Sequence, residues 1–177
     1  MIKTNIKITE RSDKIRGIIN DLSRQDFNAV DIGLFAEQDS HLIMYASANE
    51  FGVPSSAGSG LKAGWNHTIT IPERSFLRSS FDENKGTIKE TIKSNQIKVL
   101  LGQVTKNMFL KRLGEYMKSM VQKKIIDGPF KDNAESTVAR KGSNRPLIDT
   151  GRMRQSVTYR LMKYDKDHKS SAIRGME

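Results

Sequence analysis

Arginine side chains at two places in the chain are the residues best suited to bind another molecule. A guanidinium group donates several hydrogen bonds in one plane and binds carboxylates or phosphates. Arg74 and Arg78 are four residues apart and would lie on one side of a helix, where they either clamp acidic groups or are simply solvated. The second group follows Asn144 and contains four arginines: Arg145, Arg152, Arg154 and Arg160.

Other residue types give no combination that is typical of an enzyme. The chain has no Walker-type phosphate loop and no serine, histidine and aspartate in a supporting context. It has no cysteine, and its three histidines are scattered without the spacing of metal ligands. Two carboxylate pairs, at 82–83 and at 165 and 167, lie in polar, surface-like sequence. We therefore expect no catalytic residues, no metal site and no cofactor.

The composition is that of a soluble globular protein of 177 residues, with 36% hydrophobic and 28% charged residues. This length predicts one domain, which we place at 1–164, followed by a polar tail at 165–177. No apolar run approaches the roughly 20 residues that a membrane helix needs. The first residues lack the apolar segment of a signal peptide, and the absence of cysteine suits a reducing cytoplasm.

The net charge of +10 is concentrated in the second part of the chain. Residues 1–105 carry 13 Lys and Arg against 12 Asp and Glu, whereas residues 106–177 carry 17 against 8. Such a basic region is a solvated face, or it meets nucleic acid or an acidic protein surface. Charge alone does not separate these alternatives.

The second arginine group belongs to a segment whose pattern predicts a turn, one helical turn and a strand. Pro146 fixes a turn, and Asp149 and Thr150 are expected to cap a short helix at Gly151. From Ser156 onward, apolar side chains alternate with polar ones, as in a strand with one buried face.

The whole chain is predicted to have an α+β fold with a small, mainly antiparallel sheet. We expect strands near 30–36, 66–71 and 156–163 to pack against a long helix at 105–126 and a helical segment at 73–101. Pro72 suits the first position of that segment. Further helices are expected from Ser12 and at 134–141. Asp39 and Ser40 are expected to form a turn or cap. The following residues, 42–51, fit a helix or a strand, and we favour a helix that ends at Gly52 as its left-handed residue.

Residues 53–64 are rich in glycine and serine and have no periodic pattern, which predicts a flexible loop. Its length suggests a binding role, with a tolerated surface insertion as the alternative. We include Pro54 and Leu61 from this loop, and Trp65 directly after it, among the candidate interface residues.

Three short segments, taken in order, resemble a family of bacteriophage proteins. They are Ala48-Asn-Glu-Phe-Gly52, Ile71-Pro-Glu-Arg-Ser-Phe-Leu-Arg78 and Pro146-Leu-Ile-Asp-Thr-Gly-Arg-Met-Arg-Gln-Ser156. Together they are similar to motifs of the virion-morphogenesis or tail-completion proteins of tailed phages and prophages, which include the Mu-like G protein and related siphophage neck proteins. Ser75 stands where the family usually has proline, and Met153 stands where leucine is common.

The resemblance implies a non-enzymatic structural protein of the virion neck, present in the host cytoplasm during assembly. Such proteins form a ring, commonly six-fold, at the top of the tail. Their partners are copies of themselves, the head connector or stopper, and the tail terminator or tail tube, close to packaged DNA and without a membrane. We expect Arg74 and Arg78 to lie near Arg152 and Arg154 and to form a neighbour-facing surface.

A basic nucleic-acid-binding module is the alternative function, since the pI is about 9.8. Few aromatic residues interleave the basic ones, and no known nucleic-acid-binding motif is present.

Overall fold

The computed structural model describes residues 13, 15–17, 19–20, 29–35, 39–53 and 70–163. Of the described residues, 63% are helical, and two strands among them form an antiparallel sheet, which confirms the α+β prediction. The chain divides into two compact units. Unit 1 comprises 1–31, 87–114 and 160–177, and unit 2 comprises 32–86 and 115–159.

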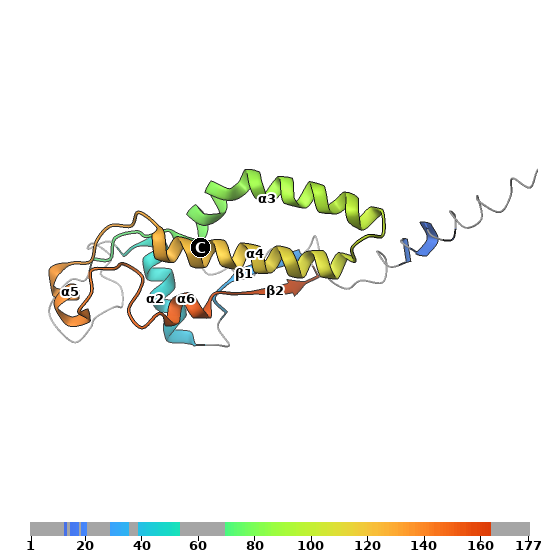
Figure 1. Cartoon of the computed structure of the whole chain (residues 1–177). Helices are drawn as coiled ribbons and strands as arrows, with labels where there is room; N and C mark the ends of the chain where they lie inside the picture. The colour runs from blue at the N-terminus through green and yellow to red at the C-terminus, as the bar shows by residue number, and fades with distance from the viewer. Residues whose placement is uncertain are drawn as a thin grey trace, which may run out of the picture. The chain divides into compact units, whose positions relative to one another are not determined.

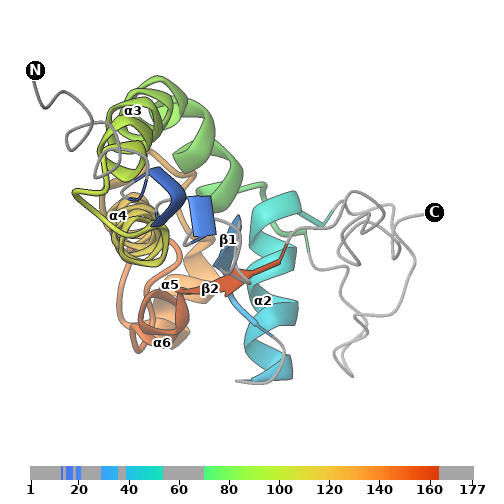
Figure 2. The same cartoon turned by 90° about the vertical axis from the view of Figure 1, so that its right-hand side faces the viewer.

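The elements follow one another along the chain as coloured in Figure 1, and Figure 2 shows them from the side. They are β1 (Ala29–Gly33), α2 (Ser40–Phe51), α3 (Phe76–Leu100), α4 (Lys106–Asp127), α5 (Glu135–Lys141), α6 (Arg152–Ser156) and β2 (Thr158–Met162). The predicted helices at 105–126 and 134–141 are confirmed as α4 and α5 within one residue at each end. Described residues between 13 and 20 are helical, in agreement with the helix expected after Ser12.

The sheet pairs β1 with β2, so two of the three predicted strands are confirmed with shorter bounds. The strand expected from 156 begins at Thr158, because Ser156 still belongs to α6 and Val157 caps that helix. Of the third predicted strand, residues 66–69 lie outside the described residues. Ile71 forms an isolated antiparallel bridge with Val53.

Helix α2 begins at a side-chain cap and ends at a glycine, as its sequence predicts. The Asp39 carboxylate accepts hydrogen bonds from the backbone N–H groups of His41 at 3.0 Å and Leu42 at 3.2 Å. Gly52 has φ 72° and ψ 164°, so the expected left-handed cap is wrong in detail. This region of backbone space is essentially restricted to glycine. A Cβ atom on Gly52 would also lie 3.0 Å from the backbone nitrogen of Glu73.

Helix α3 begins at Phe76 and not at Pro72, which corrects the prediction. Before α3, Val53 and Ile71 form an antiparallel bridge, in which the two N···O distances are 2.8 and 3.0 Å. The backbone N–H of Arg74 then donates to the Asn49 carbonyl at 2.6 Å. These bonds attach residues 71–74 to the end of α2, so Arg74 precedes the helix that contains Arg78.

The turn at Pro146 is tighter than a β-turn, and the cap of α6 differs from the expected one. Ile148 N–H donates to the Pro146 carbonyl at 2.7 Å around Leu147, whose φ is 59°. Asp149 and Thr150 were expected to cap the following helix, but the N-cap is Gly151 with φ 77° and no side-chain cap bond. The left-handed glycine reverses the chain directly, so the helix starts without a side-chain acceptor.

Each unit has its own buried apolar residues. In unit 2, one cluster joins α2, α3, α4 and the α6–β2 segment through Ala46, Phe76, Val121, Ile125, Met153 and Val157. In unit 1, buried side chains come from α3 and the first half of α4: Ile88, Phe109, Leu110 and Leu113. Long helices in each unit therefore bury one apolar stripe, as their spacing predicts.

We predict that Gly52→Ala lowers the free energy of unfolding by about 2 kcal/mol, because alanine is strained at this backbone conformation and its Cβ meets the Glu73 backbone. Chemical denaturation measures the change. The matched control is Gly86→Ala inside α3, where an added Cβ meets nothing within 4 Å. That substitution should stabilise the protein by roughly 0.5–1 kcal/mol. Equal changes in the free energy of unfolding at both positions would contradict the conclusion that Gly52 needs a backbone conformation and a space that only glycine allows.

Candidate functional site

The contact between the end of α2 and the start of α3 is organised by Glu50. Its side chain is buried, with the residue 3% exposed. The carboxylate accepts from the backbone N–H groups of Leu77 and Arg78 and from the Ser75 hydroxyl, each at 2.9 Å. These are free N–H groups of the first turn of α3, where the helix dipole also favours negative charge. Glu50 therefore caps α3 from a neighbouring helix.

Arg78 covers this cap on the solvent side. Its Nε lies 3.2 Å from Glu50 Oε1, and its Nη2 lies 2.7 Å from the Glu73 carboxylate. Nη2 also donates to the Glu50 carbonyl at 3.0 Å, and the guanidinium carbon lies 4.9 Å from the centre of the Phe51 ring. About half of the side chain remains exposed, so Arg78 stays a candidate for a partner contact.

Arg74 is buried and its donors are used inside unit 2, which corrects its expected place on a neighbour-facing surface. The residue is 6% exposed. Nε donates to the Lys131 carbonyl at 2.8 Å, and Nη1 donates to Asn49 Oδ1 at 3.0 Å. Nη2 donates to the Asp132 carbonyl at 3.0 Å and to Asn133 Oδ1 at 3.3 Å. Arg74 thus ties the end of α2 to the segment after α4.

Burial lowers the pKa of the Arg74 guanidinium, and the Asp132 carboxylate opposes that shift. Burial also lowers the pKa of Lys141, whose Nζ donates to the Arg145 carbonyl at 2.8 Å. Asp149 raises and Arg74 lowers that pKa. The same Arg145 carbonyl accepts from Asn133 at 3.2 Å. The start of the third motif is therefore held by polar bonds to the residues around Arg74.

Arg152 lies at the other end of α2, where its Nη2 lies 2.7 Å from the Asp39 carboxylate. Arg154 is half-buried, and its carbonyl accepts from the Gln122 side chain at 3.1 Å. Glu50 follows Asp39 by eleven positions, which corresponds to about 16 Å along the helix. Arg152 is therefore not near Arg74 and Arg78 as expected, because they bind opposite ends of α2.

The remaining candidate interface residues, Pro54, Leu61 and Trp65, lie outside the described residues, together with most of the predicted loop. Among the residues that the structure does describe, no group of three His, Cys, Asp or Glu side chains is placed to hold a metal ion. No described helix is long and apolar enough to span a membrane.

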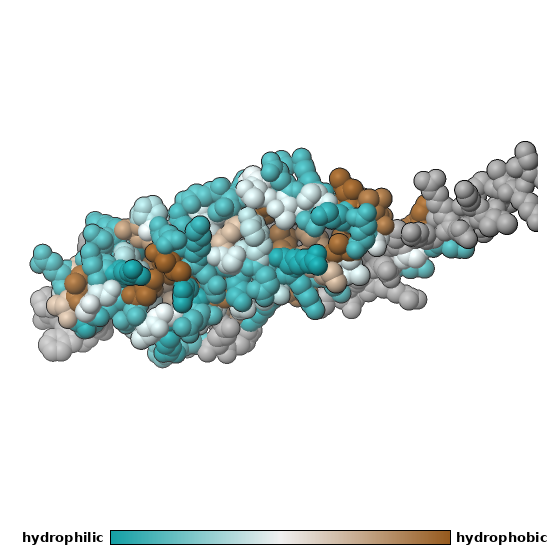
Figure 3. Space-filling view, viewed as in Figure 1, coloured by the Kyte–Doolittle hydropathy of each residue, from teal (hydrophilic) through white to brown (hydrophobic). Residues whose placement is uncertain are grey.

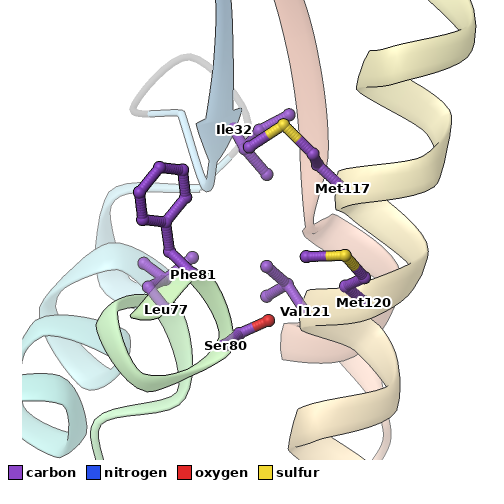
Figure 4. A pocket seen from close by; sticks show the side chains of 7 residues that line it. All are labelled: Ile32, Leu77, Ser80, Phe81, Met117, Met120 and Val121. Atoms are coloured by element: carbon purple, nitrogen blue, oxygen red, sulfur yellow. The ribbon is translucent and has the colours of Figure 1, made fainter. Parts of the chain in front are cut away.

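Unit 2 contains a small apolar pocket that the sequence did not indicate (Figure 4). Its volume is about 100 Å³. It is lined by Ile32 of β1, Leu77, Ser80 and Phe81 of α3, and Met117, Met120 and Val121 of α4. The Ser80 hydroxyl points toward Val121 in Figure 4, is buried, and makes no hydrogen bond. We call this site the α3–α4 pocket.

Unit 1 exposes four large apolar side chains around the turn that joins α3 to α4. They are Ile97, Leu100, Leu101 and Met108, which we call the hairpin tip. Figure 3 shows brown, hydrophobic surface over this turn. The helical segment predicted at 73–101 contains Ile97 and both leucines, and helical spacing alone did not indicate that they are exposed. The available signal is Gly102, which marks a turn directly after the two leucines, since connecting turns lie at the surface.

We predict that Glu50→Ala destabilises unit 2 by about 3 kcal/mol, because it leaves buried N–H groups at the start of α3 without an acceptor. Glu73→Ala removes the other carboxylate on Arg78 but should cost less than about 1 kcal/mol, since that pair is exposed. Denaturation of both variants measures the difference. A similar loss in the two variants would show that Glu50 does not act as the cap.

Comparison with protein-family models, with curated proteins and with solved structures gives no match. A function for this chain is therefore argued from its own motifs, contacts and surfaces.

Proposed function

We propose that the chain is a structural subunit of the neck of a tailed bacteriophage. Copies of it form a ring, six-fold in the commonest arrangement, at the top of the tail. The ring joins the tail terminator or tail tube to the head connector or stopper. The subunit is made in the host cytoplasm and ends in the virion, and it acts through protein contacts without catalysis or a cofactor.

The mutual contact of the three motif segments supports this proposal most. Asn49 and Glu50 of the first segment bind Arg74 and Arg78 of the second. Ala46, next to the first segment, packs in one cluster with Phe76 of the second.

The third segment joins the same cluster through its own apolar residues. Met153 is buried there, together with Val157 directly after the segment. Segments that are about 25 and 75 residues apart along the sequence therefore build one scaffold. Motifs that pack against one another in one core are typical of a shared fold. This supports a resemblance that depends on the three motifs together, because each motif alone is short.

Exposed apolar residues also suit a ring subunit. A ring of identical subunits needs two different, complementary patches on each copy. Unit 1 has the hairpin tip, and unit 2 has the α3–α4 pocket with the exposed ring of Phe81 at its edge. The two patches belong to different parts of the chain and differ in shape, one projecting and one recessed.

Binding to nucleic acid is the second candidate, and one observation favours it. Residues 91–114 contain five Lys and Arg and no Asp or Glu. Such a surface attracts phosphates. The same segment, however, exposes Leu100 and Leu101, and large aliphatic side chains gain nothing from contact with a phosphate backbone. The apolar content favours a protein partner.

Light scattering and negative-stain imaging of the purified protein test the proposal. We expect a closed ring, or a monomer that assembles into one when tail tubes are added. A persistent monomer that ignores tail tubes would reject the neck function. If that monomer bound duplex DNA with an affinity that falls steeply with salt, the second candidate would replace the first.

A further inference from the structure

We propose that the hairpin tip of one copy docks into the α3–α4 pocket of a second copy. The contact deepens the proposed ring function, on which it rests, by naming the two surfaces that join neighbouring subunits. Leu101 or Leu100 supplies the side chain that enters the pocket. Because the tip and the pocket are different surfaces, each copy has one of each free for its next neighbour.

The hairpin tip is held in shape by caps on both sides of the turn. Gly102, with φ 68°, ends α3: its N–H donates to Val99, and the N–H of Gln103 donates to Lys98. This pair of bonds is a Schellman motif. On the other side, Thr105 Oγ1 accepts from the Met108 N–H at 3.2 Å at the start of α4.

The turn therefore presents its leucines in a fixed arrangement. Leu100 is 62% exposed and Leu101 is 57% exposed, although both belong to a backbone with satisfied hydrogen bonds. Adjacent large aliphatic residues on a rigid, exposed turn are typical of a surface that is covered by a partner. A preformed tip also loses little conformational freedom when it binds.

The pocket in unit 2 fits a single side chain of this kind. A cavity of about 150 Å³ in another protein holds a benzene molecule. The α3–α4 pocket, at about 100 Å³, is smaller and fits one branched aliphatic side chain. Its lining is apolar except for Ser80, and Met117 and Met120 have flexible side chains that adjust to the guest.

Charge favours contact of the tip with the pocket over contact of two tips. The tip segment 91–114 has a net charge of +5, so two tips facing each other would repel. The helices that form the pocket carry carboxylates beside it: Asp82 and Glu83 directly after Phe81, and Glu115 two residues before Met117. All three are exposed. Glu83 and Glu115 are paired with Lys124 and Lys118 of their own subunit, so Asp82 is the carboxylate that a tip lysine such as Lys98 would meet. The pocket-bearing segments 76–86 and 115–127 carry five Lys and Arg against four Asp and Glu, a net charge of +1, so they repel the tip less than a second tip would.

Cross-linking between single-cysteine variants tests this contact, because the chain has no cysteine of its own. Leu101→Cys protein is mixed with Phe81→Cys protein and treated with a short bis-maleimide. We expect the 81–101 product to exceed same-site products several-fold. The matched control replaces Phe81→Cys with Ile126→Cys, since Ile126 is also in unit 2 and is 41% exposed against 45% for Phe81. The 101–126 product should stay at background.

A second measurement uses the double variant Leu100→Ser with Leu101→Ser. Both side chains are exposed, so the thermal unfolding temperature should change little, while the protein concentration needed for half-assembly should rise at least tenfold. Unchanged assembly, or rings without the 81–101 product, would overturn the docking contact and leave the neck function standing. Cross-linked rings that do not join tails would reject the neck function and retain the contact. A monomer under every condition, with tail tubes or without, would reject both.

Discussion

The burial of the Glu50 carboxylate is the constraint on which the arrangement of unit 2 depends. A buried carboxylate is costly unless its oxygens are satisfied by donors. Here the donors are the first N–H groups of α3, the Ser75 hydroxyl and Arg78, so the position of α3 relative to α2 is fixed by this need. Phe76 then points into the core with no exposed surface.

Gly52 and Arg74 make this arrangement possible. Between α2 and α3, the backbone at Gly52 passes so close to Ile71 and Glu73 that a side chain does not fit. Arg74 bonds to Asn49 of α2 and extends the attachment to the segment after α4 through three hydrogen bonds, two of them to backbone carbonyls. Its planar fork reaches acceptors in several directions at once, which a lysine cannot do. The most distinctive residues of the first two motifs therefore act inside unit 2.

Local patterns predicted the elements well, because helix caps and apolar periodicity depend on neighbouring residues. The helix predicted at 105–126 is α4, and the turn or cap expected at Asp39 and Ser40 is the start of α2. The place of Arg74 was not predictable, because its four acceptors come from residues 25 to 59 positions away. For the same reason, the sequence alone did not show that Arg152 and the Arg74/Arg78 pair lie at opposite ends of α2, or that a pocket forms between β1, α3 and α4.

The inward use of motif arginines changes where a partner surface should be sought. The Arg74 guanidinium already bonds four acceptors inside unit 2, so it has few donors left for a neighbour. Turning it toward a neighbour would leave buried carbonyls without donors. Exposed apolar side chains, in contrast, gain free energy when a partner covers them, because they otherwise contact water. On this ground, Leu100, Leu101 and the pocket beside Phe81 are better interface candidates than Arg74. In the proposed contact, charged residues around them would select the neighbour's orientation, because rim charges contribute more to specificity than to affinity.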